Sequence, residues 1–351
     1  MRLVLKPDSL LDWIALRANL APTPILETQI ALISARAIMA ATELRLFSRL
    51  ESGALSAAEI AEACGLDLRA TEALLPALVS TGYLRYSAQR YRLTAKSRKW
   101  LAPQNRWSLF DYMPHVRDVW RVTEGLERFL QTGRALDIHE SNFGAEQWRR
   151  YQRAMRSLAS VAADEVGRRL PVKPGAKLML DIGGSHGYYS VALCRKHPGL
   201  SAVILDLREA IEESAPILAQ ENMQDCVQHR AGNALTDDLG ENIYDLILIS
   251  NLAHHFSDAQ NRDLAKRAAR ALKPGGTLVI QEMIRPHSPA SGDQVSQVLN
   301  LFFALTSTSG TWSIAEIESW LREAKLKVGR PIFLRSVPGA AQVSGILNQS
   351  F

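Results

Sequence analysis

The 351-residue sequence contains little of what builds disulfide frameworks or metal centres. Its three cysteines, Cys64, Cys194 and Cys226, lie far apart and form neither a CxxC pair nor a His/Cys spacing typical of zinc sites. We therefore expect small buried thiols in a reducing, cytoplasmic compartment, and we expect no metal site.

Long apolar runs are also lacking. No run approaches the ~20 residues that span a bilayer, and the first residues, MRLVLKPDSLLDW, carry an early acid and proline that are untypical of a secretory signal. These absences predict no membrane partner. The hydrophobic fraction of 47% and the charged fraction of 22% are ordinary for a globular protein and exclude a disordered or collagen-like chain. The length itself predicts two domains.

The first half of the chain has the element order of a winged helix. Residues 25–50 are rich in Ala, Leu and Ile at helical spacing, which predicts one or two buried helices. Ser56 and Glu59 then fit a capping box, Gly65 ends that helix, and Asp67 caps the next one. A further glycine closes the second helix, and the alternation in YLRYSAQRYRLT predicts a small hairpin.

This pattern has two interpretations, DNA binding and protein packing. The second helix, DLRATEALLPALVSTG, would lie in the major groove, yet it has one arginine and much Ala and Leu. We expect a dimerisation module with no nucleic-acid partner, and we take the net charge of +5 as a general surface property. A ligand-sensing winged-helix regulator is an alternative that a salt-dependent gel shift on DNA would support.

The middle of the chain is predicted to link two domains and then to form a long helix. Aromatic residues that fill a core or line a pocket occur at Trp100, Trp107, Phe110, Tyr112, Trp120, Phe129 and Phe143. The helix at 145–168 is amphipathic. Its apolar face is expected to carry Trp148, Tyr151, Met155, Leu158 and Ala162. Its arginines are expected on a solvated face, at Arg149, Arg153 and Arg156.

Strands and helices alternate in the second half of the chain, which predicts an α/β fold. Apolar, β-branched segments such as YDLILIS and TLVIQEMI indicate a parallel sheet covered by helices on both faces. In such a sheet the ligand binds at the carboxyl ends of the strands, near the topological switch point.

A glycine-rich loop and a following acid suggest which ligand binds there. The loop Asp181-Ile-Gly-Gly-Ser-His-Gly187 lies between a strand and a helix, and Asp206 ends the next strand about 20 residues beyond, where a carboxylate binds ribose hydroxyls. The loop is neither GxGxxG nor a P-loop, which argues against a dinucleotide or a nucleotide phosphate. A nucleoside without phosphate, such as S-adenosylmethionine (SAM), fits both features.

With these motifs the sequence resembles, from about residue 25 to its C-terminus, a known family. The family comprises class I SAM-dependent O-methyltransferases with an N-terminal winged-helix dimerisation domain, including plant caffeate-type and bacterial natural-product enzymes. The resemblance implies a Rossmann-like methyltransferase sheet, an all-α dimerisation domain, a homodimer and a metal-free site. It divides the chain into a dimerisation domain (1–105), a helical linker (106–145) and a SAM-binding catalytic domain (146–351).

The resemblance also implies the cofactor-binding residues. LMLDIGGSHG matches the SAM loop, LDL the ribose-binding strand end, and AGNAL the segment that meets adenine. The implied residues are Asp181, Gly183, Gly184, Ser185, Gly187, Asp206, Leu207, Gly232, Asn233, Ala234 and Ser250. Ser185 stands for a usual glycine, Asn233 for an acid and Ser250 for a lysine of many plant members.

A histidine and a glutamate are the expected catalytic pair. LAHHFSD matches the family's catalytic H-D-W-x-D segment and places His254 at the base position, while Glu282 in IQEMIRP matches the glutamate that orients this base. Independently, His254 follows one strand and Glu282 ends the next, so neighbouring strands ~4.8 Å apart would bring them together. An oriented neutral imidazole suits proton removal from a phenol. Three alternatives stay open: His255 as the base, no base, and a Glu282 that only pairs with Arg285.

The sequence departs from the family at one position near the expected site, and it also suggests which residues line the acceptor pocket. Plant members have a second glutamate where this chain has Thr311. YQRAM matches the family's F-N-x-x-M segment, which implies that Tyr151 and Met155 line the acceptor pocket. Further candidates for the pocket are His255, Phe302, Phe303 and Trp312.

The expected function is methyl transfer from SAM to a hydroxyl of a small aromatic or polyketide-like secondary metabolite, with S-adenosylhomocysteine (SAH) as the product. His254 would act as general base for an SN2 displacement without a metal. The alternative suggested by Thr311 is a SAM-binding enzyme of this fold that catalyses hydroxylation, decarboxylation or a pericyclic reaction. Accumulation of SAH with the true substrate discriminates between them.

Overall fold

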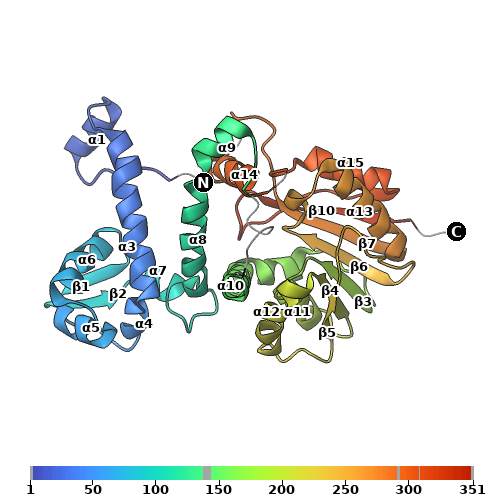
Figure 1. The fold of residues 1–351 in the computed structure, drawn as a ribbon, viewed down its shortest axis with the longest axis horizontal. Helices are drawn as coiled ribbons and strands as arrows, with labels where there is room; N and C mark the ends of the chain where they lie inside the picture. The colour runs from blue at the N-terminus through green and yellow to red at the C-terminus, as the bar shows by residue number, and fades with distance from the viewer. Residues whose placement is uncertain (1–2, 137–143, 291–292, 308, 349–351) are drawn as a thin grey trace. The chain divides into compact units, whose positions relative to one another are not determined.

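The computed structural model describes residues 3–136, 144–290, 293–307 and 309–348. Within them the chain forms two compact units, Leu3–Arg117 and Asp118–Phe351 (Figure 1). Phe143, one of the aromatic residues expected between the domains, lies outside the described residues.

The N-terminal unit is helical apart from one hairpin. Its elements are α1 (Leu10–Arg17), α2 (Thr23–Ile25), a π-helical turn η1 (Leu26–Ile30), α3 (Ala31–Glu43), α4 (Leu46–Arg49), α5 (Ala57–Cys64), α6 (Leu68–Ser80), β1 (Leu84–Ser87), β2 (Arg90–Leu93), α7 (Ala95–Trp100), a 3-10 turn η2 (Phe110–Tyr112) and the first turns of α8 (Met113–Thr123). The succession α5, α6, β1, β2 is the predicted winged-helix order.

The expected helix ends are present in this unit. The Ser56 hydroxyl accepts a hydrogen bond from the Glu59 amide (3.3 Å), and the Glu59 carboxylate accepts one from the Ser56 amide (2.6 Å), which completes the capping box. Gly65 ends α5 in the left-handed region, with φ +64°. Asp67 begins α6 by accepting from the amide of Ala70 (2.8 Å).

Helix α6 packs by an apolar face into the core of this unit. Leu75 and Leu78 are fully buried there together with Phe47 of α4 and Ile60 of α5. The opposite face of α6 bears one arginine and one glutamate among small or apolar residues: Leu68, Arg69, Ala70, Glu72, Ala73, Pro76 and Ser80. This exposed face therefore offers few groups that read base edges.

Residues 25–50 were expected to form buried helices, but most of the continuous helical stretch Thr23–Glu43 is not buried within the described chain. Among the described residues it is the one helix whose length and composition would allow it to cross a membrane, with a mean hydropathy of 1.3. A few charged residues interrupt this segment, so it is apolar on average although it contains no long unbroken apolar run. About 17% of its most apolar part is buried, and Ile33 is 53% exposed.

The C-terminal unit contains one large sheet and its covering helices. Its elements after α8 are α9 (Leu126–Thr132), α10 (Ala145–Arg169), β3 (Leu178–Ile182), α11 (Tyr188–Lys196), β4 (Ser201–Asp206), α12 (Arg208–Ala219), β5 (Val227–Ala231), β6 (Tyr244–Ser250), η3 (Ala253–His255), α13 (Asp258–Ala271), β7 (Leu272–Met283), α14 (Gln294–Thr306), α15 (Ile314–Glu323), β8 (Leu326–Val328), β9 (Ile332–Phe333) and β10 (Ala340–Leu347).

The strand order of the large sheet is β5-β4-β3-β6-β7-β10-β8, and β9 pairs with β10. The first five strands of this order are parallel, whereas β10 runs antiparallel to β7. The order reverses between β3 and β6, which is the switch point where α/β sheets bind ligands. The predicted parallel sheet is confirmed, with an added antiparallel edge.

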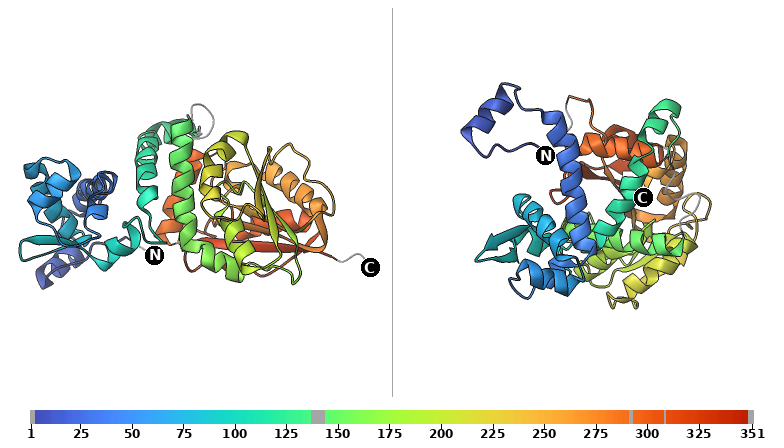
Figure 2. Two further views of the ribbon diagram at one scale, coloured as in Figure 1. Left: turned by 90° about the horizontal axis from the view of Figure 1, so that it is seen from below. Right: turned by 60° about the vertical axis from the view of Figure 1, so that its left-hand side comes forward.

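Alternating side chains of the strands build one core on each face of the sheet. On β6, Ile247 and Ile249 pack with α13 and α15, whereas Leu246 and Leu248 pack with α10, α11 and α12. Successive residues of a strand point to opposite faces, so a strand apolar at every position must be covered on both sides. Figures 1 and 2 show the sheet enclosed by helices in this way.

The buried face of α10 differs from the expected one. Trp148, Tyr151 and Met155 are only partly buried, and Leu158 is 39% exposed. The residues buried on α10 are mostly small: Gln152, Ala154, Ser157, Ala159, Ser160, Ala162, Ala163, Glu165, Val166 and Gly167. Small side chains allow close helix packing, and α10 lies against both α11 and α12.

The arginines of α10 do not form a simple solvated face either. Arg149 Nε donates to Glu213 on α12 (2.9 Å), and Arg156 donates to Glu221 just beyond α12 (2.7 Å). The Arg156 guanidinium also lies 4.0 Å from the centre of the Tyr188 ring. These contacts hold α10 against the helices that flank the glycine-rich loop.

Candidate functional site

The glycine-rich loop follows β3 at the switch point, and the side chain of Asp181 packs against it. This carboxylate is 1% exposed and accepts a hydrogen bond from Ser190 Oγ on α11 (2.7 Å). A Cβ atom on Gly184 would lie 2.5 Å from the Asp181 carboxyl carbon, so only glycine fits there. Burial, reinforced by the charge of Asp206, raises the pKa of Asp181 to about 7 although Ser190 lowers it.

Ser185 replaces a usual glycine of the family. Its amide, carbonyl and hydroxyl groups each form a hydrogen bond within the protein. Its φ of +53° is unusual for a residue with a side chain. Its amide donates to Asp206 Oδ2 (2.8 Å), and its carbonyl accepts from His229 Nε2 (2.8 Å). Its hydroxyl donates to Gln152 Oε1 on α10. These bonds compensate for the strained backbone and fix the shape of the loop.

Asp206 ends β4 beside this loop, as the sequence predicted from its spacing. Its second oxygen accepts from the Leu207 amide (2.8 Å), so the main chain of two elements orients the carboxylate. Burial raises the pKa of Asp206 to about 6, although these two backbone hydrogen bonds lower it. Asp181 and Asp206 thus form a compact acidic pair at the carboxyl ends of neighbouring parallel strands.

The remaining residues expected to contact the cofactor lie along the same edge. Gly183 donates from its amide to Leu205 O, and Gly187 precedes α11 with φ +71°. Leu207 is 45% exposed beyond the end of β4. The Gly232 amide donates to Asp206 O (2.9 Å), which ties the end of β5 to that of β4.

Asn233 and Ser250 already have partners within the protein. Asn233 Oδ1 accepts from the Leu235 amide (2.9 Å), and the partly buried Ala234 packs against the core between them. Ser250 Oγ at the end of β6 accepts from Gln281 Nε2 (2.9 Å). The carbonyl oxygen of Asn233 has a second lone pair with which to accept a further hydrogen bond.

The structure brings His254 and Glu282 together. His254 lies in η3 just after β6, Glu282 lies near the end of β7, and the two strands are parallel neighbours. His254 Nδ1 donates to Glu282 Oε2 (3.0 Å), and Glu282 Oε1 accepts from the Ala253 amide (2.6 Å). His254 is 4% exposed and Glu282 1%. One carboxylate therefore orients both the imidazole and the turn that carries it.

Two aromatic rings pack against the His254 ring. The ring centres of His255 and Phe303 each lie 4.2 Å from that of His254. Phe302 in turn packs edge-on against Phe303 (5.5 Å). Rings at such offset distances restrict rotation of the imidazole. His255 and Phe302 thus lie near the His254–Glu282 pair.

Arg285 does not pair with Glu282, which removes one alternative from the sequence analysis. Its guanidinium donates to the carboxylate of Glu316 (2.5 Å) and to Thr311 O (2.8 Å). Thr311 itself is 1% exposed, and its hydroxyl donates to Asn300 Oδ1 on α14. A neutral hydroxyl–amide pair therefore occupies the position of the family's second glutamate.

Trp312 supports the catalytic turn from the core. It is 8% exposed, packs edge-on against Trp320 (5.1 Å between ring centres), and its Nε1 donates to Ala253 O (2.9 Å). Tyr151 and Met155 are partly buried on α10. The hydrogen bond to Ala253 O places Trp312 beside the turn that carries His254 and His255.

Three contributing residues escaped the sequence analysis. Asn261 Nδ2 donates to Ala253 O (2.9 Å) and Phe256 O (3.1 Å), so it fixes both ends of the catalytic turn. Gln281 reaches Ser250, and Gln152 reaches Ser185. The one available signal was an amide side chain within an otherwise apolar strand, which is true of Gln281 alone.

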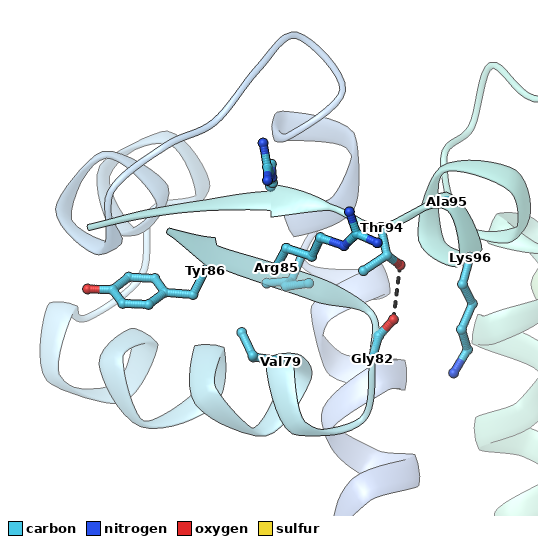
Figure 3. A pocket seen from close by; sticks show the side chains of 9 residues that line it. Val79, Gly82, Arg85, Tyr86, Thr94, Ala95 and Lys96 are labelled. Carbon is cyan, nitrogen blue, oxygen red and sulfur yellow. Dashed lines mark hydrogen bonds between the residues drawn. The ribbon is translucent and has the colours of Figure 1, made fainter. Parts of the chain in front are cut away.

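A hollow in the N-terminal unit carries no comparable chemistry. It lies between the hairpin and the end of α6 (Figure 3). There Thr94 Oγ1 donates to Gly82 O (2.9 Å), and Lys96 Nζ donates to Thr81 O (3.2 Å). Burial lowers the pKa of Lys96. Elsewhere in the described part of the chain, no three His, Cys, Asp or Glu side chains cluster to hold a metal ion.

Comparison with known families accounts for both units. A family model described as the O-methyltransferase domain matches residues 121–325. A second model, described as the O-methyltransferase dimerisation domain, matches residues 26–103. The two matches together span most of the chain, in the order that the sequence predicted.

Individual relatives differ in the atom that they methylate. The chain is 27% identical over 341 residues to 3-hydroxy-5-methyl-1-naphthoate 3-O-methyltransferase of Streptomyces sahachiroi, covering 93% of this chain and 95% of that protein. It is 25% identical over 315 residues to the N,N-dimethyltransferase OxyT of Streptomyces rimosus, covering 87% and 90%. In fold it matches human N-acetylserotonin methyltransferase, solved in complex with SAM, with a TM-score of 0.82, 19% identity and coverage of 94% and 99%.

Proposed function

Because this chain belongs to the O-methyltransferase family, we propose that it transfers a methyl group from SAM to a hydroxyl of a small aromatic or polyketide-like secondary metabolite in the cytoplasm. The observation that carries this proposal is the buried His254–Glu282 pair, which lies at the same sheet edge as the glycine-rich loop and Asp206.

The residues at the loop fit SAM. Asp206 keeps free lone pairs beside the loop and suits the two ribose hydroxyls. The buried Asp181 suits a positive group, because an adjacent cation would favour its ionised form. When bound, SAM supplies an electrophilic methyl group on a positively charged sulfur.

In the proposed reaction His254 serves as the base. Its Nδ1–H is held by Glu282, so Nε2 is the nitrogen left to accept the proton of the acceptor hydroxyl. The acceptor oxygen then forms its bond to the methyl carbon while the electron pair of the carbon–sulfur bond passes to sulfur, which yields SAH. Glu282 stabilises the imidazolium that results. The proposed reaction is metal-independent.

The aromatic acceptor class rests on the rings around His254. Phe302 and Phe303 of α14 present apolar surface beside the base, and we place Tyr151 and Met155 of α10 at the far wall of the acceptor pocket. The naphthoate O-methyltransferase of Streptomyces sahachiroi acts on a compound of this kind. A flat hydroxylated ring would bury its faces against these side chains.

We also propose a homodimer and a division of labour along the chain. Residues 1–105 would form the dimerisation domain, 106–145 a helical linker and 146–351 the catalytic domain. Two observations support a protein partner for the helical stretch Thr23–Glu43. The dimerisation-domain match includes most of it, and its apolar side chains Ile30 and Ile33 are 48% and 53% exposed. Light scattering should give twice the monomer mass for the wild type and the monomer mass for Ile33→Glu.

The central experiment is a screen of phenolic and polyketide acceptors with SAM, read by mass spectrometry. A gain of one methyl group, with one SAH formed per product, supports the proposal, and His254→Ala serves as the matched inactive control. Conversion of an acceptor without SAH would instead favour the non-methylating chemistry that the neutral Thr311 position suggests. A methyl group found on nitrogen or carbon would overturn the O-specificity alone.

A further inference from the structure

The β1–β2 hairpin of the N-terminal unit carries two arginines directly opposite each other. Side chains alternate along each strand, so Leu84 and Leu93 are buried while Arg85 and Arg92 point to the other face and are exposed. The register of the antiparallel pair places Arg85 against Arg92. Such opposed residues have Cβ atoms ~4.5–5.5 Å apart, so like charges at these positions destabilise the hairpin.

Neither of these two arginines is neutralised by the protein itself. The neighbouring Arg90 donates to both oxygens of the Glu59 carboxylate (3.0 and 2.8 Å) and to Ala54 O (3.0 Å). Arg85 and Arg92 have no hydrogen-bond or ion-pair partner among the residues that the structure describes. Charge can protect edge strands from aggregation, but an arginine opposite a glutamate would do so and would add stability. The opposed arginines therefore favour a negatively charged partner from outside the chain.

Positive charge continues around the hollow beside the hairpin. The hollow has a volume of about 640 Å³, and Arg85, Arg92 and Lys96 line it without any carboxylate. In Figure 3, Arg85 and Lys96 lie on either side of the hydrogen bond that joins Thr94 to Gly82. The chain between Glu72 and Asp111 contains basic residues and no acidic ones, at Arg85, Arg90, Arg92, Lys96, Arg98, Lys99 and Arg106.

The kinds of side chain on this surface indicate which anion it binds. A guanidinium group is planar, and its paired N–H donors match the two oxygens of a carboxylate or a phosphate. Tyr86, beside the arginines, is 53% exposed, and tyrosine and arginine are both enriched where proteins bind each other. The exposed face of α6 carries Glu72 among small or apolar residues, whereas a nucleic-acid backbone requires positive charge along its path. Carboxylates of a protein therefore fit better than phosphates of a nucleic acid.

We propose that the hairpin and the rim of the hollow form a docking surface for a segment of another protein that is rich in Asp and Glu. Arg85 and Arg92 would each bind a carboxylate, and Lys96 would add to the attraction. Lys96 is already positioned for this, because its Nζ donates to Thr81 O (3.2 Å) and lies 3.8 Å from the centre of the Tyr83 ring. The partner's carboxylates would remove the repulsion between the two arginines, so the same pair that destabilises the free hairpin would stabilise the complex.

The test uses the full chain and two labelled anionic probes, a short peptide of alternating glutamate and alanine and a duplex oligonucleotide. Fluorescence anisotropy at about 0.1 M salt measures both affinities, since the Debye length of about 10 Å at this salt screens distant charges. Arg92→Glu reverses one charge of the opposed pair. Arg330→Glu is the matched control, because Arg330 is also exposed and has no partner in the described part of the chain, but belongs to the C-terminal unit.

The wild type should bind the peptide more tightly than the duplex. Arg92→Glu should weaken peptide binding by roughly 5- to 30-fold, and Arg330→Glu should change it less than about twofold. The melting temperature of Arg92→Glu should stay the same or rise, because the opposed charges now attract each other. A weaker affinity in a protein of equal or greater stability separates docking from a structural role of Arg92.

Four results would overturn the proposal. Absence of peptide binding by the wild type would show that the surface does not dock carboxylates, and equal weakening in Arg92→Glu and Arg330→Glu would show attraction by net charge alone. Tighter binding of the duplex, lost in Arg92→Glu, would make the hairpin a nucleic-acid surface. A change of oligomeric state in Arg92→Glu, measured by light scattering, would assign the hairpin to an interface between copies of this chain.

Discussion

The two sides of the sheet edge are built in different ways. On the cofactor side, at the ends of β3 and β4, main-chain amides of Ser185 and Leu207 fix Asp206, and every polar group of Ser185 is bonded. On the proposed acceptor side, at the ends of β6 and β7, the geometry depends on side chains: the rings of His255 and Phe303 pack against His254, and one carboxylate holds it.

The difference has a functional meaning. Backbone contacts tolerate change in neighbouring side chains, so a site built from them suits one invariant ligand, the cofactor. Aromatic side chains can be exchanged without disturbing the sheet, so a site built from them suits acceptors that vary between relatives. The relatives named above, which methylate oxygen and nitrogen, agree with this division.

His254→Ala is expected to distinguish the two sides most clearly, because it should affect turnover without affecting cofactor binding. Removal of the base should lower kcat by about 10³-fold, within the range typical of general-base catalysis. The dissociation constant of SAH should stay unchanged, because the cofactor side keeps its contacts. Single-turnover kinetics and calorimetry on the same preparation measure the two effects. A larger kcat loss in His255→Ala than in His254→Ala would instead make His255 the base.

Asp206→Ala should produce the opposite pattern. Two backbone amides lose their acceptor and the ribose hydroxyls lose their ligand, so we expect SAM binding to weaken by at least about 100-fold. Calorimetry measures the loss. Near-normal SAM affinity in a folded Asp206→Ala protein would refute the assignment of the ribose site.

Glu282→Gln tests how far a single carboxylate organises the acceptor side. The amide can still accept one of the two hydrogen bonds, from Ala253 N or His254 Nδ1, but its NH₂ group faces the other donor. We expect a roughly 10- to 100-fold lower kcat, with unchanged SAH affinity. A wild-type rate in a folded Glu282→Gln protein would show that Glu282 has only a structural role.

Because of the acidic pair Asp181 and Asp206, the folding stability should fall and the affinity for SAM should rise as the pH increases. Asp carboxylates titrate near 3.9 when unfolded, and burial raises their pKa in the folded protein to about 7 for Asp181 and about 6 for Asp206. The free folded protein therefore holds protons that the unfolded chain has released, and its stability should fall as the pH rises from about 4 to about 7.

Cofactor binding favours the ionised carboxylates, so SAM affinity should rise about tenfold between pH 5.5 and 7.5, with release of protons. Calorimetry in buffers of different ionisation enthalpy counts these protons. Asp181→Asn should flatten both the stability and the affinity profile between pH 5.5 and 7.5. A wild-type protein whose melting temperature increases over this range would contradict the raised pKa values.

The smallest expected effect is that of Trp312→Phe on the acceptor side. The change removes the hydrogen bond from Nε1 to Ala253 O but keeps most of the packing against Trp320. Loss of one such bond should cost about 1 kcal/mol of unfolding free energy. Denaturant unfolding measures this, and kcat should fall only a few-fold because Asn261 still holds Ala253 O.

Much of the fold was predictable because its signals are local. The capping box at Ser56, the left-handed Gly65 and the alternation of strands and helices are each readable within a short window of sequence. The stretch Thr23–Glu43 was expected to be buried because its composition is apolar, yet composition does not say what an apolar helix packs against, and only about 17% of its most apolar part is buried.

The site was predictable only where a residue lies at the end of a strand. Asp181, Asp206 and Glu282 could be placed in this way, since parallel strands end at one edge. Gln152 could not, because α10 turns that side chain towards a loop 33 residues away. The carboxylate partners of Arg149 and Arg156 could not be predicted for the same reason, since they lie on or just beyond a helix that packs alongside.

By itself, the sequence determined the order of elements, the helix caps, the glycine-rich loop and the acids that follow it. These depend on hydrogen bonds and side-chain periodicity within a few residues of each other. Only the tertiary structure decided that β6 lies beside β7, that Glu282 pairs with His254 and not with Arg285, and that Phe303 packs against the His254 ring. Such contacts join residues far apart in the chain, and they are selected by the packing of the whole sheet and its helices.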